Sequence, residues 1–215
     1  MAKKKQTVNI PSLIITGVAV LLAISAVVFL LFFMPKSEEE QPVETTPAET
    51  EFNPPSELLQ SAQLAAPDLL TNNYKAYQYF TQGMSYEQEP YGNKPEDGLY
   101  TCSNDTYKTF EQFSDFIKSI YTETAAEKLL TDPYGKGAVF ADRNGQLGIS
   151  YEFIQSGRIE DNGISWENGK YSFTLTSETE CDVEITLKDK DDKDVKINTK
   201  MILENNVWKL AEMVG

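Results

Sequence analysis

The sequence contains no histidine and only two cysteines among its 215 residues. Without histidine, the chain cannot form Ser-His-Asp or Cys-His nucleophilic systems or a histidine metal site. It also lacks Ser-x-x-Lys, G-x-S-x-G and glycine-rich phosphate-binding patterns. A hydrolase that uses only carboxylates stays open, although the spacing of the Asp and Glu residues selects no pair. We therefore expect a protein that is not an enzyme and needs no cofactor.

Acidic residues are absent before Glu38, and all 33 of them follow from that position. Lys3, Lys4 and Lys5 are three of the 19 basic residues, which leaves 16 basic against 33 acidic side chains after Met34 and a net charge of −17 there. Such a charge disfavours binding to nucleic acid or anionic lipid headgroups. It is compatible with a basic protein partner or cations, and a solvated surface that only keeps the domain soluble is the alternative.

One long stretch lacks charge altogether: its apolar run begins at Leu13 and ends at Met34. As a helix it would reach roughly 30 Å, the thickness of a bilayer's hydrocarbon core. We expect residues 10–34 to form a single anchor in the cell membrane. Residues 1–9 should stay in the cytoplasm as a short stub, because lysines precede the span and glutamates follow it. A cleaved signal peptide is the alternative, but the run does not end in a small-x-small site.

The anchor is followed by a segment that is poor in large apolar side chains. Residues 35–55 contain five prolines and six glutamates, a composition typical of an extended linker. Apolar residues return from Ser56, so residues 56–215 are expected to form one extracytoplasmic domain. A chain of this length can bury about two thirds of its unfolded surface and build a core.

The first half of this domain carries helical signals. A short helix should start at Ser56, and Pro67 should restart a second helix that ends at Gly83. Thr109 followed by Gln112 forms a capping-box pattern, which predicts another helix with an aromatic and aliphatic face. A shorter helix should follow it.

The second half changes to a period of two. Apolar residues alternate with polar ones over residues 171–175 and 183–187, and the turn signals DRNG, ENGK, KDKDDKD and ENN separate the strands. With helices on the buried face, the pattern predicts an α+β fold. Its expected form is N-terminal helices packed on a curved antiparallel β-meander, preceded by one transmembrane helix.

Residues 84–98 form a loop that is long for a connection and contains two prolines and four acidic residues. Long loops on compact domains are disproportionately functional, so this loop is the first candidate for a partner-binding surface. A surface excursion without a partner is the alternative. The candidate contact residues are Glu87, Glu89, Tyr91, Glu96 and Asp97.

Four aspartates over residues 189–194 resemble a calcium-binding loop. The sixth position has no glycine, however, and Lys200 stands where the twelfth-position glutamate belongs. We interpret this segment as a charged hairpin turn and expect no metal site. The sequence Asn104-Asp105-Thr106 also fits the pattern for N-glycosylation.

Cys102 and Cys181 are the only cysteines, and both follow the expected membrane span. Cys181 is in phase with the inward-facing Val183 and Ile185. A disulfide between the two cysteines and two buried free thiols are both compatible with the sequence, because it does not report the distance between them.

The order of these features resembles the IseA-type inhibitors of bacterial cell-wall DL-endopeptidases. The resemblance covers residues 66–187 and rests on a tyrosine-rich helix, an acidic loop, the strand LYTCS, the segment YKTFEQFSDFIKSIYTETAAEKLL and the hairpin VFADRNGQLGIS. It implies a non-enzymatic protein that occludes the active-site cleft of an NlpC-type peptidoglycan hydrolase and restrains wall autolysis, and an acidic domain would suit a basic cleft. The anchor and linker differ from the family's secreted members.

Two other functions stay open. A cystatin-like or nuclear-transport-factor-like domain also packs helices on a curved sheet, and it would bind a small ligand or wall fragment in an apolar pocket. A carboxylate-only wall hydrolase would need two carboxyl groups about 5 Å or about 6.5–9.5 Å apart in a cleft.

Overall fold

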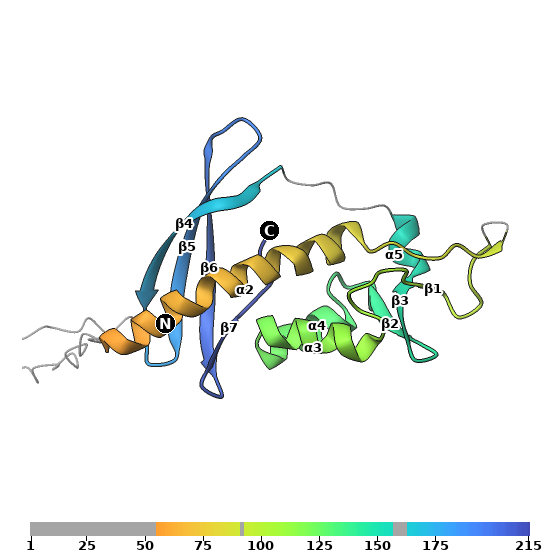
Figure 1. Cartoon of the computed structure of the whole chain (residues 1–215), viewed down its shortest axis with the longest axis horizontal. Coiled ribbons are helices and arrows are strands. Elements are labelled where there is room, and N and C mark those ends of the chain that lie inside the picture. The colour runs from red at the N-terminus through yellow and green to blue at the C-terminus, as the bar shows by residue number, and fades with distance from the viewer. Residues whose placement is uncertain (1–54, 91–92, 157–162) are drawn as a thin grey trace, which may run out of the picture. The chain divides into compact units, whose positions relative to one another are not determined.

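The structure is a computed structural model that describes residues 55–90, 93–156 and 163–215. The expected transmembrane helix and linker, and Tyr91 of the loop, lie outside these residues. Within them, no helix combines the length and the hydropathy that crossing a bilayer requires. The described elements are four helices and two antiparallel sheets, so the α+β class is confirmed (Figure 1).

The first described element, α2 (Ser56–Gln82), is one continuous helix. The prediction of a break at Pro67 is wrong. Proline removes the donor for the Gln63 carbonyl at a cost of about 3 kcal/mol, but both residues are exposed, so water can satisfy that oxygen. The helix continues because buried side chains on both sides of the proline share one face: Ala62, Ala66, Leu69 and Leu70.

The smaller sheet has the strand order β1-β3-β2 and consists of β1 (Leu99–Thr101), β2 (Phe140–Arg143) and β3 (Gln146–Ser150). A two-residue turn joins β2 to β3, since Asn144 and Gly145 both have positive φ. This is the hairpin that the DRNG signal predicts.

Two helices pack beside the smaller sheet, α3 (Phe110–Ile120) and α4 (Glu123–Thr131). The predicted capping box is confirmed at the start of α3, where Thr109 and Gln112 bond reciprocally. The shorter helix α4 begins after Thr122, whose hydroxyl accepts a hydrogen bond from a backbone N–H in the first turn.

A short helix, α5 (Tyr151–Ser156), follows β3 where the sequence predicted only strands. The Ser150 hydroxyl accepts a hydrogen bond of 3.3 Å from the Phe153 N–H and so caps the helix. Phe153 and Ile154 pack over Gly83, which has φ +78° and no side chain to obstruct them.

The larger sheet is a meander of β4 (Ser165–Leu175), β5 (Glu180–Lys188), β6 (Asp194–Glu204) and β7 (Val207–Leu210). The predicted single meander therefore needs a correction, because β1 to β3 form a separate sheet. The ENGK segment is not a turn but an irregularity within β4, between Ser165 and Lys170.

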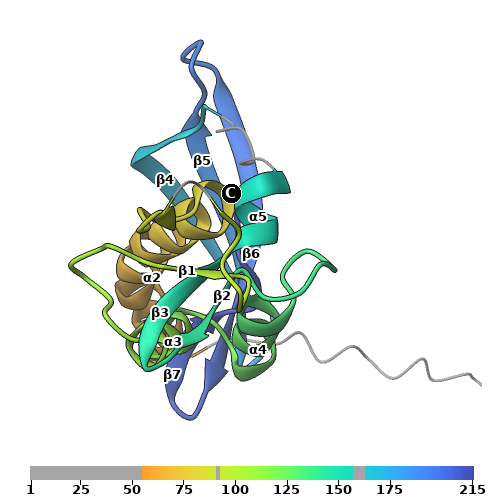
Figure 2. The same ribbon diagram turned by 90° about the vertical axis from the view of Figure 1, so that its right-hand side faces the viewer.

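One hydrophobic core includes buried residues from both sheets and from α2 to α4. Figures 1 and 2 show α2 running along the larger sheet and on toward α3 and the smaller sheet. Trp208 of β7 donates a hydrogen bond of 2.9 Å to the Ser61 hydroxyl of α2, and Tyr134 donates one of 3.0 Å to the Phe80 carbonyl near the other end of that helix.

Candidate functional site

The first part of the candidate loop is paired to the chain that follows β1. The Glu87 N–H donates to the Thr101 carbonyl (2.9 Å), and the Ser103 N–H donates to the Ser85 carbonyl (2.8 Å). Between these bonds, Tyr86 and Cys102 form an antiparallel bridge. Residues 85–87 thus extend the smaller sheet, and the prediction of an unstructured loop is wrong for this part.

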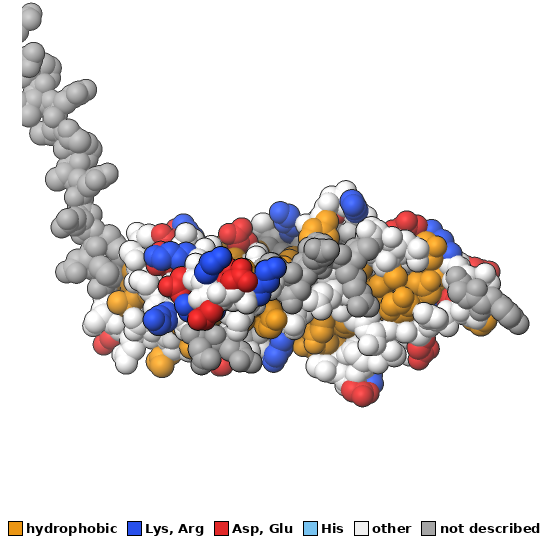
Figure 3. Space-filling model, turned by 90° about the horizontal axis from the view of Figure 1, so that it is seen from above, with side chains coloured by type: hydrophobic (Ala, Val, Ile, Leu, Met, Phe, Trp, Pro, Cys, Tyr) orange, Lys and Arg blue, Asp and Glu red, His pale blue; other side chains and the backbone are white. Residues whose placement is uncertain are grey.

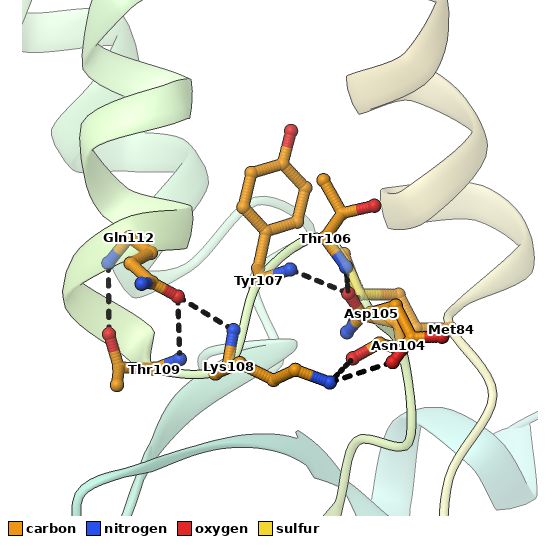
Figure 4. Close-up of polar contacts among 8 residues, drawn as sticks. All are labelled: Met84, Asn104, Asp105, Thr106, Tyr107, Lys108, Thr109 and Gln112. Carbon is orange, nitrogen blue, oxygen red and sulfur yellow. Dashed lines mark hydrogen bonds and ion pairs between the residues drawn. The ribbon is translucent and has the colours of Figure 1, made fainter.

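The turn before α3 holds the other side of this pairing (Figure 4). The Asn104 side-chain oxygen accepts from the N–H groups of Thr106 (3.0 Å) and Tyr107 (2.7 Å), and its amide donates to the Met84 sulfur (3.4 Å). Lys108 binds the Asn104 carbonyl (3.0 Å) and the Asp105 carboxylate (2.8 Å). The Asn104 side chain therefore holds this turn through its oxygen and joins it to Met84 through its nitrogen.

The second part of the loop is held by Arg143, which lies at the end of β2. Its Nη2 donates to Glu89 Oε1 (2.9 Å), its Nε donates to Asp97 Oδ2 (2.9 Å), and its Nη1 donates to Thr101 Oγ1 (3.1 Å). Only 19% of the Arg143 side chain is exposed. We call Arg143, Glu89, Asp97 and Thr101 the arginine brace, since one planar cation fixes both ends of this second part of the loop to the sheet.

The brace changes the ionisation of its members. The pKa of Asp97 lies below its ordinary value, first because the Leu99 N–H donates to the carboxylate (3.1 Å) and then because Arg143 does. The pKa of Arg143 is raised, chiefly by its hydrogen bond to Glu89. Asp97 and Arg143 are therefore both fully charged at neutral pH.

A second attachment joins the loop to α5. Lys94 forms an ion pair of 2.7 Å with Glu152 and lies 5.0 Å from the centre of the Tyr151 ring. Tyr100, which contacts the Tyr151 ring, stacks on Tyr86 with ring centres 4.7 Å apart. Figure 3 shows hydrophobic side chains gathered toward the right-hand end of the face that it draws.

These contacts separate the predicted contact residues into those that can meet a partner and those that hold the loop. Glu87 and Glu96 are exposed and can meet a partner, whereas Glu89 and Asp97 are brought together on Arg143 and serve the loop itself. Tyr91 lies outside the described residues. An open hollow of about 800 Å³ lies between the loop and Arg143, with the exposed Glu96 on its wall.

Sequence reasoning missed Arg143 and Lys94, the two cations that fix the loop. The sequence predicts Arg143 only as part of the DRNG turn. The sequence signal that could have found it is its rarity, because the chain has only two arginines and this one lies in the predicted DRNG turn. An isolated arginine in so acidic a chain is a natural partner for the carboxylates of a nearby loop.

The two cysteines are free thiols and belong to different sheets, and only Cys181 is buried, whereas Cys102 is partly exposed. Cys102 bridges to Tyr86 beside β1, and Cys181 is fully buried on β5. Burial raises the pKa of the Cys102 thiol to about 12. Its thiolate is therefore scarce at neutral pH, and it is a poor nucleophile.

The aspartate-rich segment forms the β5–β6 turn, as predicted. Asp189 Oδ1 accepts from the N–H groups of Asp191 (2.8 Å) and Lys193 (2.9 Å), and Lys188 pairs with Asp194 (2.8 Å). Figure 3 shows charges of both signs mixed at this tip. Among the residues with described positions, no three His, Cys, Asp or Glu side chains gather as metal ligands.

No protein-family model matches the chain, and a search of curated proteins gave no significant match.

Proposed function

We propose that this chain is a single-pass membrane protein whose residues 56–215 work outside the cytoplasm and bind another protein rather than catalyse a reaction. The uncharged run that begins at Leu13 supplies the anchor, and the acidic linker over residues 35–55 holds the domain away from the membrane. The missing histidines and the net negative charge support a binding role.

The proposed partner is a cell-wall endopeptidase of the NlpC type with a basic cleft. Its support is the resemblance to IseA-type inhibitors together with one observation, the arginine brace. Backbone pairing to the chain after β1 fixes Glu87, and the arginine brace fixes the part of the loop that carries Glu96, so little conformational entropy is lost when a partner binds. Complementary charge would also speed the encounter with a basic cleft.

The test is inhibition of peptidoglycan digestion. The full chain in nanodiscs is titrated into a digestion by an NlpC-type endopeptidase, and wall solubilisation is followed. We expect inhibition at a stoichiometric ratio that weakens as salt rises. The double variant Glu87→Lys and Glu96→Lys should weaken inhibition about tenfold or more.

The matched control reverses two exposed glutamates away from the loop, Glu127→Lys and Glu178→Lys, which changes the net charge equally. Equal effects of both pairs would show that only net charge matters and would remove the loop from the proposal. Absence of inhibition and of binding at micromolar concentration would leave a ligand-binding domain. Digestion by the chain alone would make it a hydrolase.

A further inference from the structure

A pocket of about 470 Å³ lies between α2 and the start of β4, away from the arginine brace. Figures 1 and 2 both place β4 against α2. The buried Leu70 forms part of the pocket wall. A volume of this size suits one small ring or a short oligomer, and such pockets combine apolar walls with a few polar groups.

Two aromatic rings form one wall. Tyr74 of α2 and Trp166 of β4 stack with ring centres 5.6 Å apart and an angle of 22° between their planes. Tyr171 lines the pocket farther along β4. Flat aromatic faces offer apolar area at little entropic cost, and the stacked pair forms a rigid surface.

The Trp166 indole N–H is a buried donor without a partner in the described part of the chain. The other indole, Trp208, shows the usual arrangement, because it donates to the Ser61 hydroxyl at 2.9 Å. Leaving a buried donor unpaired costs about 1–3 kcal/mol. Because Nε1 exposes almost no surface, a ligand acceptor meets it only after a small rotation of the Trp166 ring toward the pocket, and that contact would recover the loss.

The polar side chains that line the pocket are neutral hydroxyl groups and one positively charged group. Thr71, Tyr74, Ser165 and Tyr171 contribute hydroxyls, and Lys75 contributes an ammonium that forms no ion pair with any described residue. The described lining contains no carboxylate, although the chain as a whole is strongly acidic. This lining matches a ligand with several hydroxyls and one negative charge, and it disfavours a cation.

We propose that this pocket binds a saccharide that carries a carboxylate. The C–H face of a pyranose ring packs on an indole or phenol face, while its hydroxyls exchange hydrogen bonds with the surrounding hydroxyl groups. A ring oxygen or hydroxyl accepts from Trp166 Nε1, and the carboxylate pairs with Lys75. A proline-rich peptide would also stack on these rings, but it offers only carbonyl acceptors and leaves the four hydroxyls without matching groups.

The probes are methyl β-D-glucuronide and methyl β-D-glucoside, which share a ring and differ in the carboxylate. They are titrated against the full chain in nanodiscs, and the two indole N–H resonances are followed by NMR, with Trp166 assigned from Trp166→Phe. We expect the Trp166 resonance to shift on binding, with a glucuronide dissociation constant of about 1 mM and weaker binding of the glucoside.

Variants separate the contributions. Trp166→Phe keeps a ring but loses the donor, and it should weaken glucuronide binding about tenfold in ligand-observed NMR. Lys75→Met should reduce the affinity for the glucuronide to that for the glucoside. Lys128→Met, at an exposed lysine of α4 that forms no ion pair with any described residue, is the matched control and should change neither affinity.

Three results would overturn the proposal: no binding of either glycoside at about 20 mM, equal binding of both, or binding only of an acidic proline-rich peptide. The titration contains no endopeptidase. A failure here therefore leaves the inhibitor proposal standing, and a failure of that proposal leaves the pocket unaffected.

Discussion

Asn73 is a fully buried polar residue that joins three parts of the domain. Its amide donates to the Val214 carbonyl (2.7 Å), and its oxygen accepts from the Val214 N–H (3.0 Å) and the Tyr121 hydroxyl (2.9 Å). Asn73→Ala leaves three buried polar groups without this partner. We expect the free energy of unfolding in urea to fall by about 3 kcal/mol.

The neighbouring Asn72→Ala is the control, because Asn72 is only partly buried and takes no part in this set of bonds. It should change stability by less than about 0.5–1 kcal/mol. Similar losses in both variants would mean that helix α2 is sensitive to any alanine here, and that the Asn73 hydrogen bonds contribute little.

Asp97 gives the brace a pH dependence of known sign. Its folded-state pKa lies below the ordinary value, so its contribution is fully present above about pH 4 and is lost as pH falls through the folded pKa. Asp97→Asn should therefore flatten part of the fall in stability at acid pH, measured by urea denaturation at several pH values. The control is Asp115→Asn, at an exposed aspartate that pairs with no cation among the described residues, and it should leave that curve unchanged.

The β6–β7 hairpin stabilises two helix ends at once. Lys209 donates two hydrogen bonds of 2.8 Å to the Lys118 and Ser119 carbonyls at the end of α3, and Glu204 accepts one of 3.2 Å from the Glu123 N–H at the start of α4. A cation at a helix C-terminus and an anion at an N-terminus both complement the helix dipole. Burial lowers the pKa of Lys209, so desolvation offsets part of this gain.

Lys209→Met should lower the free energy of unfolding by about 1–2 kcal/mol, because two carbonyls lose a charged donor. The control is Lys196→Met on β6, which breaks only the surface pair with Glu184 and should cost at most about 1 kcal/mol. Thermal melts of both variants provide the comparison. A larger loss in the control would contradict the capping role of Lys209.

The sequence correctly predicted those elements that are determined by residues close together in the chain. The Thr109 capping box gave the start of α3, and strict alternation gave the buried face of β5. The wrong predictions concern segments whose conformation is determined by tertiary contacts. Burial on both sides carries α2 through Pro67, and in the ENGK segment Gly169 leaves room for a close approach, since a Cβ there would lie 2.8 Å from the Leu187 side chain.

The candidate loop was located from composition, but the roles of its residues were not. Spacing along the chain does not show which carboxylates will face a cation, and Arg143 lies 46 positions from Asp97 and 54 from Glu89. The pocket beside Trp166 was also invisible in the sequence, because its walls come from a helix and a strand far apart in the chain.

The two sheets share one core, and this determines how the domain should unfold. Buried residues of the smaller sheet, such as Phe140 and Ile149, and of the larger sheet, such as Ile185 and Met201, belong to one hydrophobic cluster with α2. Neither sheet can lose its partners without exposing that cluster. We therefore expect one cooperative transition for the domain.

Both tryptophans, Trp166 and Trp208, belong to the larger sheet and contact α2, so their fluorescence reports on that sheet and its contacts with the helix. Hydrogen exchange of peptides from β3 reports on the smaller sheet. In a urea series the two probes should give the same midpoint and slope, since each sheet is buried against the same helix. Two separate midpoints would show that α2 and its contacts, including the Trp208 bond to Ser61, do not couple the sheets, and the shared core would then not be a cooperative unit.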